Sequence, residues 1–345
     1  AEAWSLSLPE LFERGEKTFS HLKGHGQWSD AMARLGPSKV MVDELRLANP
    51  DAEVTLKGAY AYNPKGSDYI DIQGDLLRAD VSKVGDYLPL VVGAGARQWL
   101  QYNLKAGDAQ AGHMVLRGAL SQFPFAHKGD DGEFRIQARV ANGALTYAPG
   151  WPAIAGVEGQ LVFKGHSMLI EADRAQTQGV QLEQVRASID NLGSADPLLE
   201  ISGLGKGELQ NMLGFVKTSP VGRLLNNALD EARGTGEAEL KIKLTIPILK
   251  AEQTQVQGQL QLRNNTARLV HGMPEVKQLQ GLVEFSNKGV QLKQVRGKAL
   301  EAAVQVSGGT NAQGNLDIRA TGMAKSEGLA EYLNPLLVPY LQGGL

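Results

Sequence analysis

The stretch from Leu116 to Phe163 decides the fold, and its main segments are LRGALSQFPF, GEFRIQARVANGALTYAPGWPAI and GQLVF. Apolar and polar residues alternate along it, and Gly, Pro and Asn interrupt the alternation. A period of two is typical of strands that have one dry face and one wet face. The pattern continues almost to the end of the chain, so we expect a mainly β protein.

The composition limits the class of protein. The chain has 345 residues, enough for one large or two ordinary domains, and 42% of them are hydrophobic, which suffices for a sizeable core. A net charge of −2, without any basic run that contains aromatic residues, argues against nucleic acid as a partner. The absence of cysteine excludes disulfides, a thiol nucleophile and Cys-ligated zinc.

The sequence contains no obvious membrane or targeting segment. No apolar run reaches the roughly 18 residues of a membrane-spanning helix. The first residues, AEAWSLSLPELFERGEKTF, lack the basic and long apolar regions of a signal peptide. We therefore expect either a soluble protein or a fragment, and a start without Met favours the fragment.

Helical spacing is predicted at a few places. Residues 9–35 have the apolar spacing of a helix that breaks at Gly24 to Gly26 and is followed by a second short helix, which together would cap a sheet end. A helical hairpin then recurs between blocks of alternating strands, around Pro89, Pro220 and Pro335. Trp151 is expected to fill one end of the sheet, and the alternative is an amphipathic anchor that touches lipid headgroups.

The recurring hairpin indicates a repeat. Pro152 and Phe163 have the same spacing as Pro274 and Phe285, within corresponding blocks of strands. We therefore expect an N-terminal helical segment, a partial β-repeat and two further β-repeats, each ending in a helical hairpin and the last one truncated, at residues 1–36, 37–110, 111–235 and 236–345.

No constellation of reactive side chains is evident. Ser20 to Lys23 matches the S-x-x-K motif, but the companion motifs S-D-N and K-T-G are missing. His21 and His25 have the spacing of two metal ligands on a helix, yet glycines break the helix there. We therefore predict that the chain is not an enzyme and holds neither a metal nor a cofactor.

Four motifs within residues 50–170 resemble the AsmA-like superfamily of bacterial envelope proteins, and within it the YhdP-like chains. They are PDAEVTLKGAYAYNPKGSDYIDIQGDLLRADVSKVGDYLP (Pro50 to Pro89), ARQWLQYNLKAG (Ala96 to Gly107), LRGALSQFPF (Leu116 to Phe125) and LTYAPGWPAI (Leu145 to Ile154). The resemblance implies an elongated, curled groove of antiparallel strands, with short helical hairpins between repeats, that passes phospholipids between the inner and outer bacterial membranes.

The resemblance also implies a location and partners. The whole protein would be periplasmic and anchored in the inner membrane by a segment that this sequence lacks. Its partners would be phospholipid acyl chains, and inner-membrane and outer-membrane envelope proteins are further candidates. Nothing in the family's pattern supplies a catalytic residue.

The physical chemistry of the strands is compatible with a groove. A dry face must be covered, either by a second sheet in a sandwich, by closure of the sheet, or by a guest in a curled sheet. Short connections favour neighbouring strands in a meander, and recurring hairpins suit one long sheet. Burying an acyl chain gains roughly 0.8 kcal/mol per CH2 without fixing its position, which would allow the lipid to slide.

The residues that we expect to line this groove alternate along the predicted strands. They are Val54, Leu56, Ile70, Ile72, Leu116, Phe134, Ile136, Val140, Leu161, Phe163, Ile170, Leu182, Leu240, Ile242, Leu260, Leu262, Phe285, Leu292, Val304 and Ile318. The alternative for each is ordinary core packing, and a register error would move a strand's whole set to the other face.

Two other functions stay open at this point. A periplasmic scaffold or adaptor of envelope biogenesis would dock partners through its strand edges without conducting lipid. An enzyme acting on cell-wall or lipid substrates would need clustered titratable residues with shifted pKa values.

Overall fold

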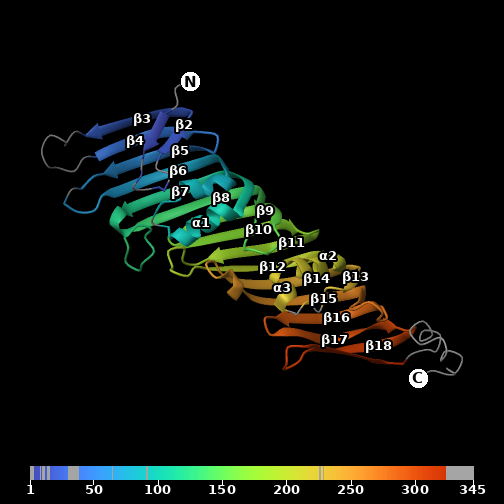
Figure 1. The fold of residues 1–345 in the computed structure, drawn as a ribbon. Coiled ribbons are helices and arrows are strands. Elements are labelled where there is room, and N and C mark those ends of the chain that lie inside the picture. The colour runs from blue at the N-terminus through green and yellow to red at the C-terminus, as the bar shows by residue number, and fades with distance from the viewer. Residues whose placement is uncertain are drawn as a thin grey trace, which may run out of the picture.

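The computed structural model of this chain describes residues 4–7, 9, 12–13, 16–29, 39–63, 65–90, 92–224, 227 and 229–323. Its dominant feature is one long antiparallel sheet of seventeen strands, β3 to β19, whose strands cross the long axis of the molecule (Figure 1). The alternating sequence pattern therefore predicts the fold class correctly, as a mainly β, elongated and curled sheet with few helices.

Most strands of the sheet follow one another as a meander with short connections. In chain order they are β3 His21–Ser29, β4 Lys39–Ala48, β5 Ala52–Ala61, β6 Tyr69–Asp80, β7 Leu104–Ala119, β8 Gly132–Leu145, β9 Ile154–Lys164, β10 Ser167–Thr177, β11 Val180–Ile189, β12 Leu198–Glu208, β13 Arg233–Thr235, β14 Glu237–Pro247, β15 Gln255–Arg268, β16 Val276–Ser286, β17 Gly289–Ala299, β18 Ala302–Thr310 and β19 Leu316–Gly322.

The sheet is open at both ends. Strands β12 and β14 pair directly, while β13 and β14 follow each other along β15. Within the described ranges, β3 pairs with β4 alone and β19 with β18 alone, and these two edge strands lie at opposite ends of the molecule (Figure 1). A separate two-stranded sheet consists of β1 (Trp4–Ser7) and β2 (Glu16–Phe19).

The helix predicted over residues 9–35 is wrong where the structure describes it, because β2 and β3 occupy that stretch. Gly24 and Gly26, which look like a helix stop, lie against β4. A Cβ on Gly26 would come within 2.7 Å of the Met41 carbonyl oxygen. The glycines therefore permit close strand approach instead of ending a helix. The second short helix was expected over residues that mostly fall outside the described ranges.

Two of the predicted helical hairpins are confirmed. The first consists of the 3-10 helix η1 (Val81–Tyr87) and α1 (Ala94–Asn103), and the second of α2 (Leu209–Thr218) and α3 (Pro220–Leu224). The Ser219 hydroxyl accepts a hydrogen bond from the Val221 amide at 3.3 Å and so starts α3. Two single 3-10 turns, η2 (Leu120–Gln122) and η3 (Ala251–Gln253), lie in strand connections. The hairpin expected around Pro335 lies outside the described residues.

Recurring β-bulges help to curl the sheet. In six strands one non-glycine residue has a left-handed backbone, and each lies at the middle of its strand or nearer the end at which the helical hairpins connect: Ala111 (φ 48), Asn142 (φ 54), Gln184 (φ 51), Asn264 (φ 63), Gln278 (φ 53) and Gln294 (φ 52). The pairing register shifts beside each of them. Because a bulge bends its strand and increases its twist, bulges on the same side of successive strands add up to a curl.

The repeated spacing found in the sequence falls on equivalent strands. Gly159 on β9 and Gly281 on β16 each face the bulge of the following strand. A Cβ on Gly159 would lie 2.6 Å from the Ala172 Cα, and one on Gly281 would lie 2.7 Å from the Val295 Cα. The glycines therefore occupy equivalent close contacts, although the sheet itself continues without interruption through the predicted repeat boundaries.

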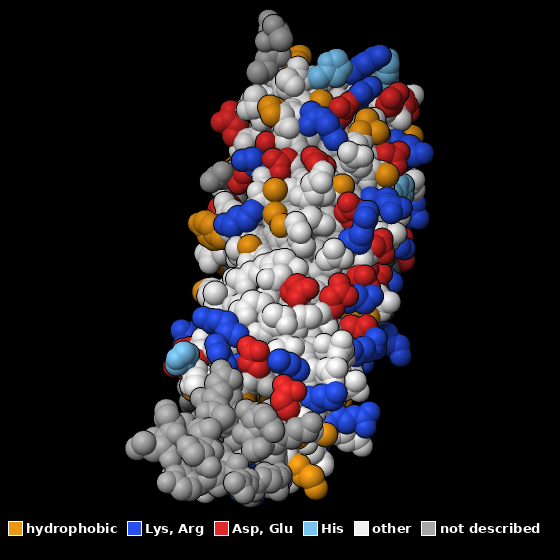
Figure 2. Space-filling view, turned by 90° about the vertical axis from the view of Figure 1, so that its right-hand side faces the viewer, with side chains coloured by type: hydrophobic (Ala, Val, Ile, Leu, Met, Phe, Trp, Pro, Cys, Tyr) orange, Lys and Arg blue, Asp and Glu red, His pale blue; other side chains and the backbone are white. Residues whose placement is uncertain are grey.

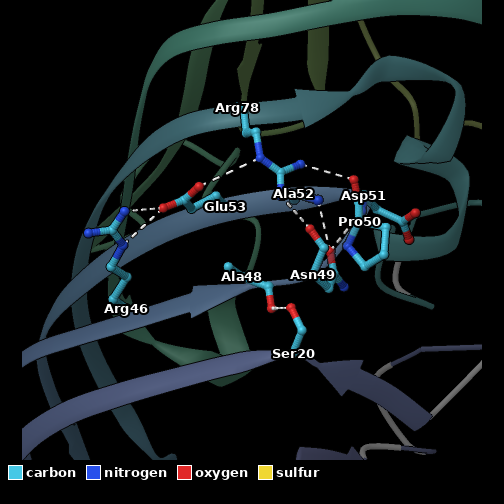
Figure 3. Close-up of polar contacts among 9 residues, drawn as sticks. All are labelled: Ser20, Arg46, Ala48, Asn49, Pro50, Asp51, Ala52, Glu53 and Arg78. Atoms are coloured by element: carbon cyan, nitrogen blue, oxygen red, sulfur yellow. Dashed lines mark hydrogen bonds and ion pairs between the residues drawn. The ribbon is translucent and has the colours of Figure 1, made fainter. Parts of the chain in front are cut away.

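The polar turn between β4 and β5 is fixed by a network of side chains at one sheet edge (Figure 3). Asn49 accepts hydrogen bonds from the amides of Asp51 and Ala52 at 3.0 and 2.8 Å. Arg78 donates to the carbonyls of Asn49 and Pro50 and pairs with Glu53. This network holds the turn against β6.

Candidate functional site

The candidate site is one whole face of the sheet. In an antiparallel pair, directly opposite residues point to the same face. The register places Ile72 opposite Leu116, and Leu116 opposite Phe134. Such rows recur along the molecule, for example from Leu240 through Leu260 on β14 and β15. We call this side the apolar face.

All twenty residues predicted to line a groove belong to the apolar face, as the register and the burial clusters together show. Phe163 and Leu262 are buried, and the other eighteen are partly buried. Their contact with lipid stays a prediction, but the face on which they stand follows from the register.

The opposite side, the charged face, carries cross-strand ion pairs. Arg117 pairs with Asp71 at 3.1 Å on neighbouring strands, and Lys206 pairs with Glu183 at 2.8 Å. Figure 2 shows acidic and basic side chains interspersed along the molecule. Exposed pairs of this kind contribute at most about 1 kcal/mol each, so their main effect is to keep this face hydrated.

The apolar face has two long rims. The hairpin rim is the edge at which β6 connects to β7, β8 to β9 and β12 to β13, and it carries both helical hairpins. The turn rim is the opposite edge, where β7 connects to β8, β9 to β10, β11 to β12 and β14 to β15. In the part of the chain that the structure describes, no second large sheet covers the apolar face, which disfavours a sandwich.

Helix α1 crosses the apolar face from rim to rim. Its Trp99 Nε1 donates a 2.9 Å hydrogen bond to the Tyr147 carbonyl oxygen on the hairpin rim. At its other end, Gly95 lies so close to Leu249 on the turn rim that a Cβ would be 2.6 Å from Leu249 Cδ2. Gly93 is just as close to the turn rim, because a Cβ on it would lie 3.1 Å from the Leu192 carbonyl oxygen.

The face is tightly packed where α1 crosses it. Trp99 and Leu100 belong to the same buried cluster as Leu199 and Ile246, which are each 1% exposed. A groove along this face is therefore occupied by the protein's own helix over part of its length. Sequence patterns gave no sign of this crossing.

More accessible stretches flank the crossing. Towards the N-terminus, Val54, Leu56 and Ile72 are partly exposed, and none of them packs into the buried clusters of the described residues. Towards the C-terminus, α2 packs Leu209 and Met212 into a second cluster, at whose margin apolar strand residues stay partly exposed. These residues include Leu240, Leu260, Val283 and Leu292.

The FPF turn, residues 123–125, folds its rings onto the apolar face at the turn rim. The ring centroids of Phe123 and Phe134 lie 5.1 Å apart. Phe125 covers Gly118 and Gly132, where a Cβ would come within 2.7 and 2.4 Å of its ring. The sequence marks FPF as a motif, but only the register shows which face its rings cover.

Trp151 has the packing role expected of it, but at the hairpin rim and not at an end strand of the sheet. It is 6% exposed, and its ring centroid lies 5.5 Å from Tyr147 and 6.0 Å from Phe215 of α2. Burial raises the pKa of Tyr147, because the charged phenolate would lose its hydration there.

The motifs considered for catalysis do not form a site. Ser20 to Lys23 spans the start of β3, so its residues lack the helical geometry that S-x-x-K requires, and His21 and His25 are exposed on the same strand. Among the described residues, no group of three or more His, Asp or Glu side chains could hold a metal ion. None of the helices in the described ranges is both long and apolar enough to cross a membrane.

Together these features define a class: a single-layered, curled β-sheet with one apolar and one charged face. The sequence matches the family of the YhdP protein over residues 1–345, and the chain belongs to that family.

A curated relative gives the match more detail. The intermembrane phospholipid transporter YhdP of Escherichia coli (strain K12) is 23% identical to this chain over 241 residues, which are 69% of this chain and 19% of that protein. The chain thus aligns with about a fifth of the length of that relative. No solved structure matches it.

Proposed function

We propose that this chain is a segment of a bridge-like protein that carries phospholipids between the inner and outer bacterial membranes. The acyl chains lie along the apolar face, and the headgroups stay in water at a rim. The observation that carries the proposal is the series of apolar rows that the register places on one face from β5 to β18, which stays partly exposed on either side of the crossing by α1. The family and the transporter relative support it.

The energetics of such a face suit a moving lipid. Each buried CH2 of an acyl chain gains roughly 0.8 kcal/mol, and this gain has no preferred direction. Rows such as Leu240, Leu260 and Val283 repeat the same chemistry from strand to strand. A chain can therefore exchange one row for the next at little net cost, whereas a pocket with fixed polar anchors would retain it.

The same proposal extends to location and organisation. The whole protein stands in the periplasm and is held in the inner membrane by a segment outside this sequence. The repeats at 37–110, 111–235 and 236–345 are lengths of one continuous lipid path, with the helical hairpins placed along one rim. Envelope proteins at either membrane are its further partners, and the segment itself carries out no catalytic step.

A photo-crosslinking experiment tests the proposal in cells. A photoreactive side chain is placed at Leu292 or at the next residue, Lys293, and likewise at Leu56 or Lys57. Each pair stands on one strand but on opposite faces. Phospholipid adducts are expected from Leu292 and Leu56, and background levels from the two lysine positions.

The scaffold alternative gives a different outcome. If Leu292 and Leu56 form adducts with proteins and not with lipid, the apolar face is a docking surface and the transport proposal is wrong. A Leu292→Asp variant provides a second readout: copurified phospholipid should fall while the β content in circular dichroism stays unchanged. Lys293→Asp is its matched control.

A further inference from the structure

A cleft of about 510 Å³ opens in the turn rim beside the apolar face. Three connections enclose it: the loop after η2, the β9–β10 turn and the start of the β11–β12 connection. We propose that this cleft holds the zwitterionic headgroup of a phospholipid, a phosphate joined to an ammonium group. This inference rests on the proposed function, because the acyl chains would lie on the apolar face.

Basic groups from two different connections converge on the cleft. The rings of His127 and His166 lie edge to face, with centroids 5.9 Å apart. His127 follows η2 on one connection, and His166 stands in the β9–β10 turn. Imidazole N–H groups are side-chain donors that suit phosphate oxygens.

An acidic residue lines the cleft as well. Asp190 contributes to its wall, and its carboxylate forms no ion pair within the described part of the chain. A carboxylate beside the imidazoles would repel a simple anion. It would attract the ammonium group of a zwitterion, so the mixture of charges favours a phosphate–ammonium headgroup over a purely anionic one.

The floor of the cleft joins it to the proposed lipid path. Phe125 and Phe134 line the cleft, and Phe134 stands opposite Leu116 in a row of the apolar face. A headgroup beside the histidine pair therefore leaves its acyl chains directed onto that row. The turn rim thus holds headgroups, and the apolar face holds chains.

Isothermal titration calorimetry on this chain tests the cleft with three ligands. They are a phosphatidylethanolamine with two six-carbon chains, the diacylglycerol with the same chains, and chain-free glycerophosphoethanolamine. The phospholipid should bind about tenfold more tightly than the diacylglycerol, the factor that one charge-assisted hydrogen bond supplies. His127→Ala/His166→Ala should abolish this preference. His113→Ala, which removes a histidine paired with Asp75 on the charged face, should keep it.

Each different calorimetric result rules out either the headgroup site or the proposed function. Equal affinity for phospholipid and diacylglycerol, or a preference that survives His127→Ala/His166→Ala, rules out the headgroup site while the apolar face stands. Glycerophosphoethanolamine binding as tightly as the phospholipid shows a site for free polar phosphates and not for lipid. If neither chain-bearing ligand binds, the proposed function itself fails, and the cleft proposal fails with it.

Discussion

The Trp99 indole Nε1 donates a 2.9 Å hydrogen bond to the Tyr147 carbonyl oxygen, and this bond fixes α1 to the hairpin rim. Both residues are buried, at 7% and 3% exposure. A helix that crosses an apolar face has no strand pairing to hold it. Its position therefore depends on such contacts at its two ends.

The contribution of Trp99 can be divided between packing and hydrogen bonding. Trp99→Ala should lower the free energy of unfolding by about 3–5 kcal/mol, because it removes a large buried ring. Trp99→Phe keeps most of the ring but leaves the Tyr147 carbonyl without its donor, which should cost about 1–3 kcal/mol. Denaturant unfolding measures both. Equal losses for the two variants would show that the hydrogen bond, and not the ring, supplies the whole effect.

A second tight contact, which only a glycine permits, lies between β15 and β16. A Cβ on Gly258 would come within 2.1 Å of Cζ of Phe285, whose ring covers the glycine on the apolar face. Gly258→Ala should therefore destabilise the chain by about 1–3 kcal/mol through overpacking. In a Phe285→Leu background the same change should cost much less. A double-mutant cycle of unfolding free energies measures the coupling, and additive costs would contradict the contact.

The strands and the residues of the apolar face could be predicted from the sequence, because both depend on a local period of two. Alternation assigned Phe134, Leu260 and Leu292 to one side of their strands, and the short connections kept neighbouring strands in order. The same reasoning failed at Gly24 and Gly26, because a glycine that lets two strands approach has no local signature that separates it from a helix stop.

The crossing helix and the bulges could not be predicted for a different reason. The end of α1 is set by the contact between Gly95 and Leu249, which are far apart in the sequence. The bulges at Asn142 and Gln184 are defined only by the register with a neighbouring strand. Both features need the three-dimensional neighbours, which alternation within one strand does not encode.

The β5–β6 turn predicts a pH dependence of stability. The Tyr60 hydroxyl donates to Asp68 Oδ2 at 2.5 Å, and this bond to the carboxylate raises the pKa of Tyr60 to about 12. In the unfolded chain a tyrosine titrates near about 10. The stability contributed by this group is therefore present below about pH 10 and is lost as the pH rises towards about 12.

Substitution of either partner separates this effect from global alkaline unfolding. Tyr60→Phe should flatten the dependence of unfolding free energy on pH in that interval. Tyr62→Phe, at an exposed position of the same turn, removes only the smallest of the causes that raise the Tyr60 pKa and should change the dependence far less. At the acid end, the Asn63 amide and then the Tyr60 hydroxyl hold the pKa of Asp68 below its usual value. Asp68→Asn should therefore reduce the stability lost as the pH falls through that lowered pKa. Profiles that match the wild type in both variants would contradict the assignment.

A disulfide between α1 and the turn rim should reveal whether lipid passes beneath this helix. A Cβ on Gly95 would lie 3.3 Å from Leu249 Cγ, so Gly95→Cys with Leu249→Cys places two sulfurs within bonding reach. The natural chain has no other cysteine to compete. Because the apolar face under α1 is packed, passage requires the helix to lift. The oxidised variant should therefore transfer a fluorescent phospholipid between vesicles about tenfold more slowly, as expected when a covering segment is locked shut.

Reduction of the disulfide supplies the internal control for this prediction. Transfer should return to the wild-type rate when a reductant opens the bond, and the single variants Gly95→Cys and Leu249→Cys should be insensitive to oxidation. Equal transfer by the oxidised and reduced double variant would place the lipid path outside α1, on the more accessible stretches alone. No transfer in any state, wild type included, would instead count against lipid carriage by this segment. The experiment thus distinguishes a wrong route from a wrong function.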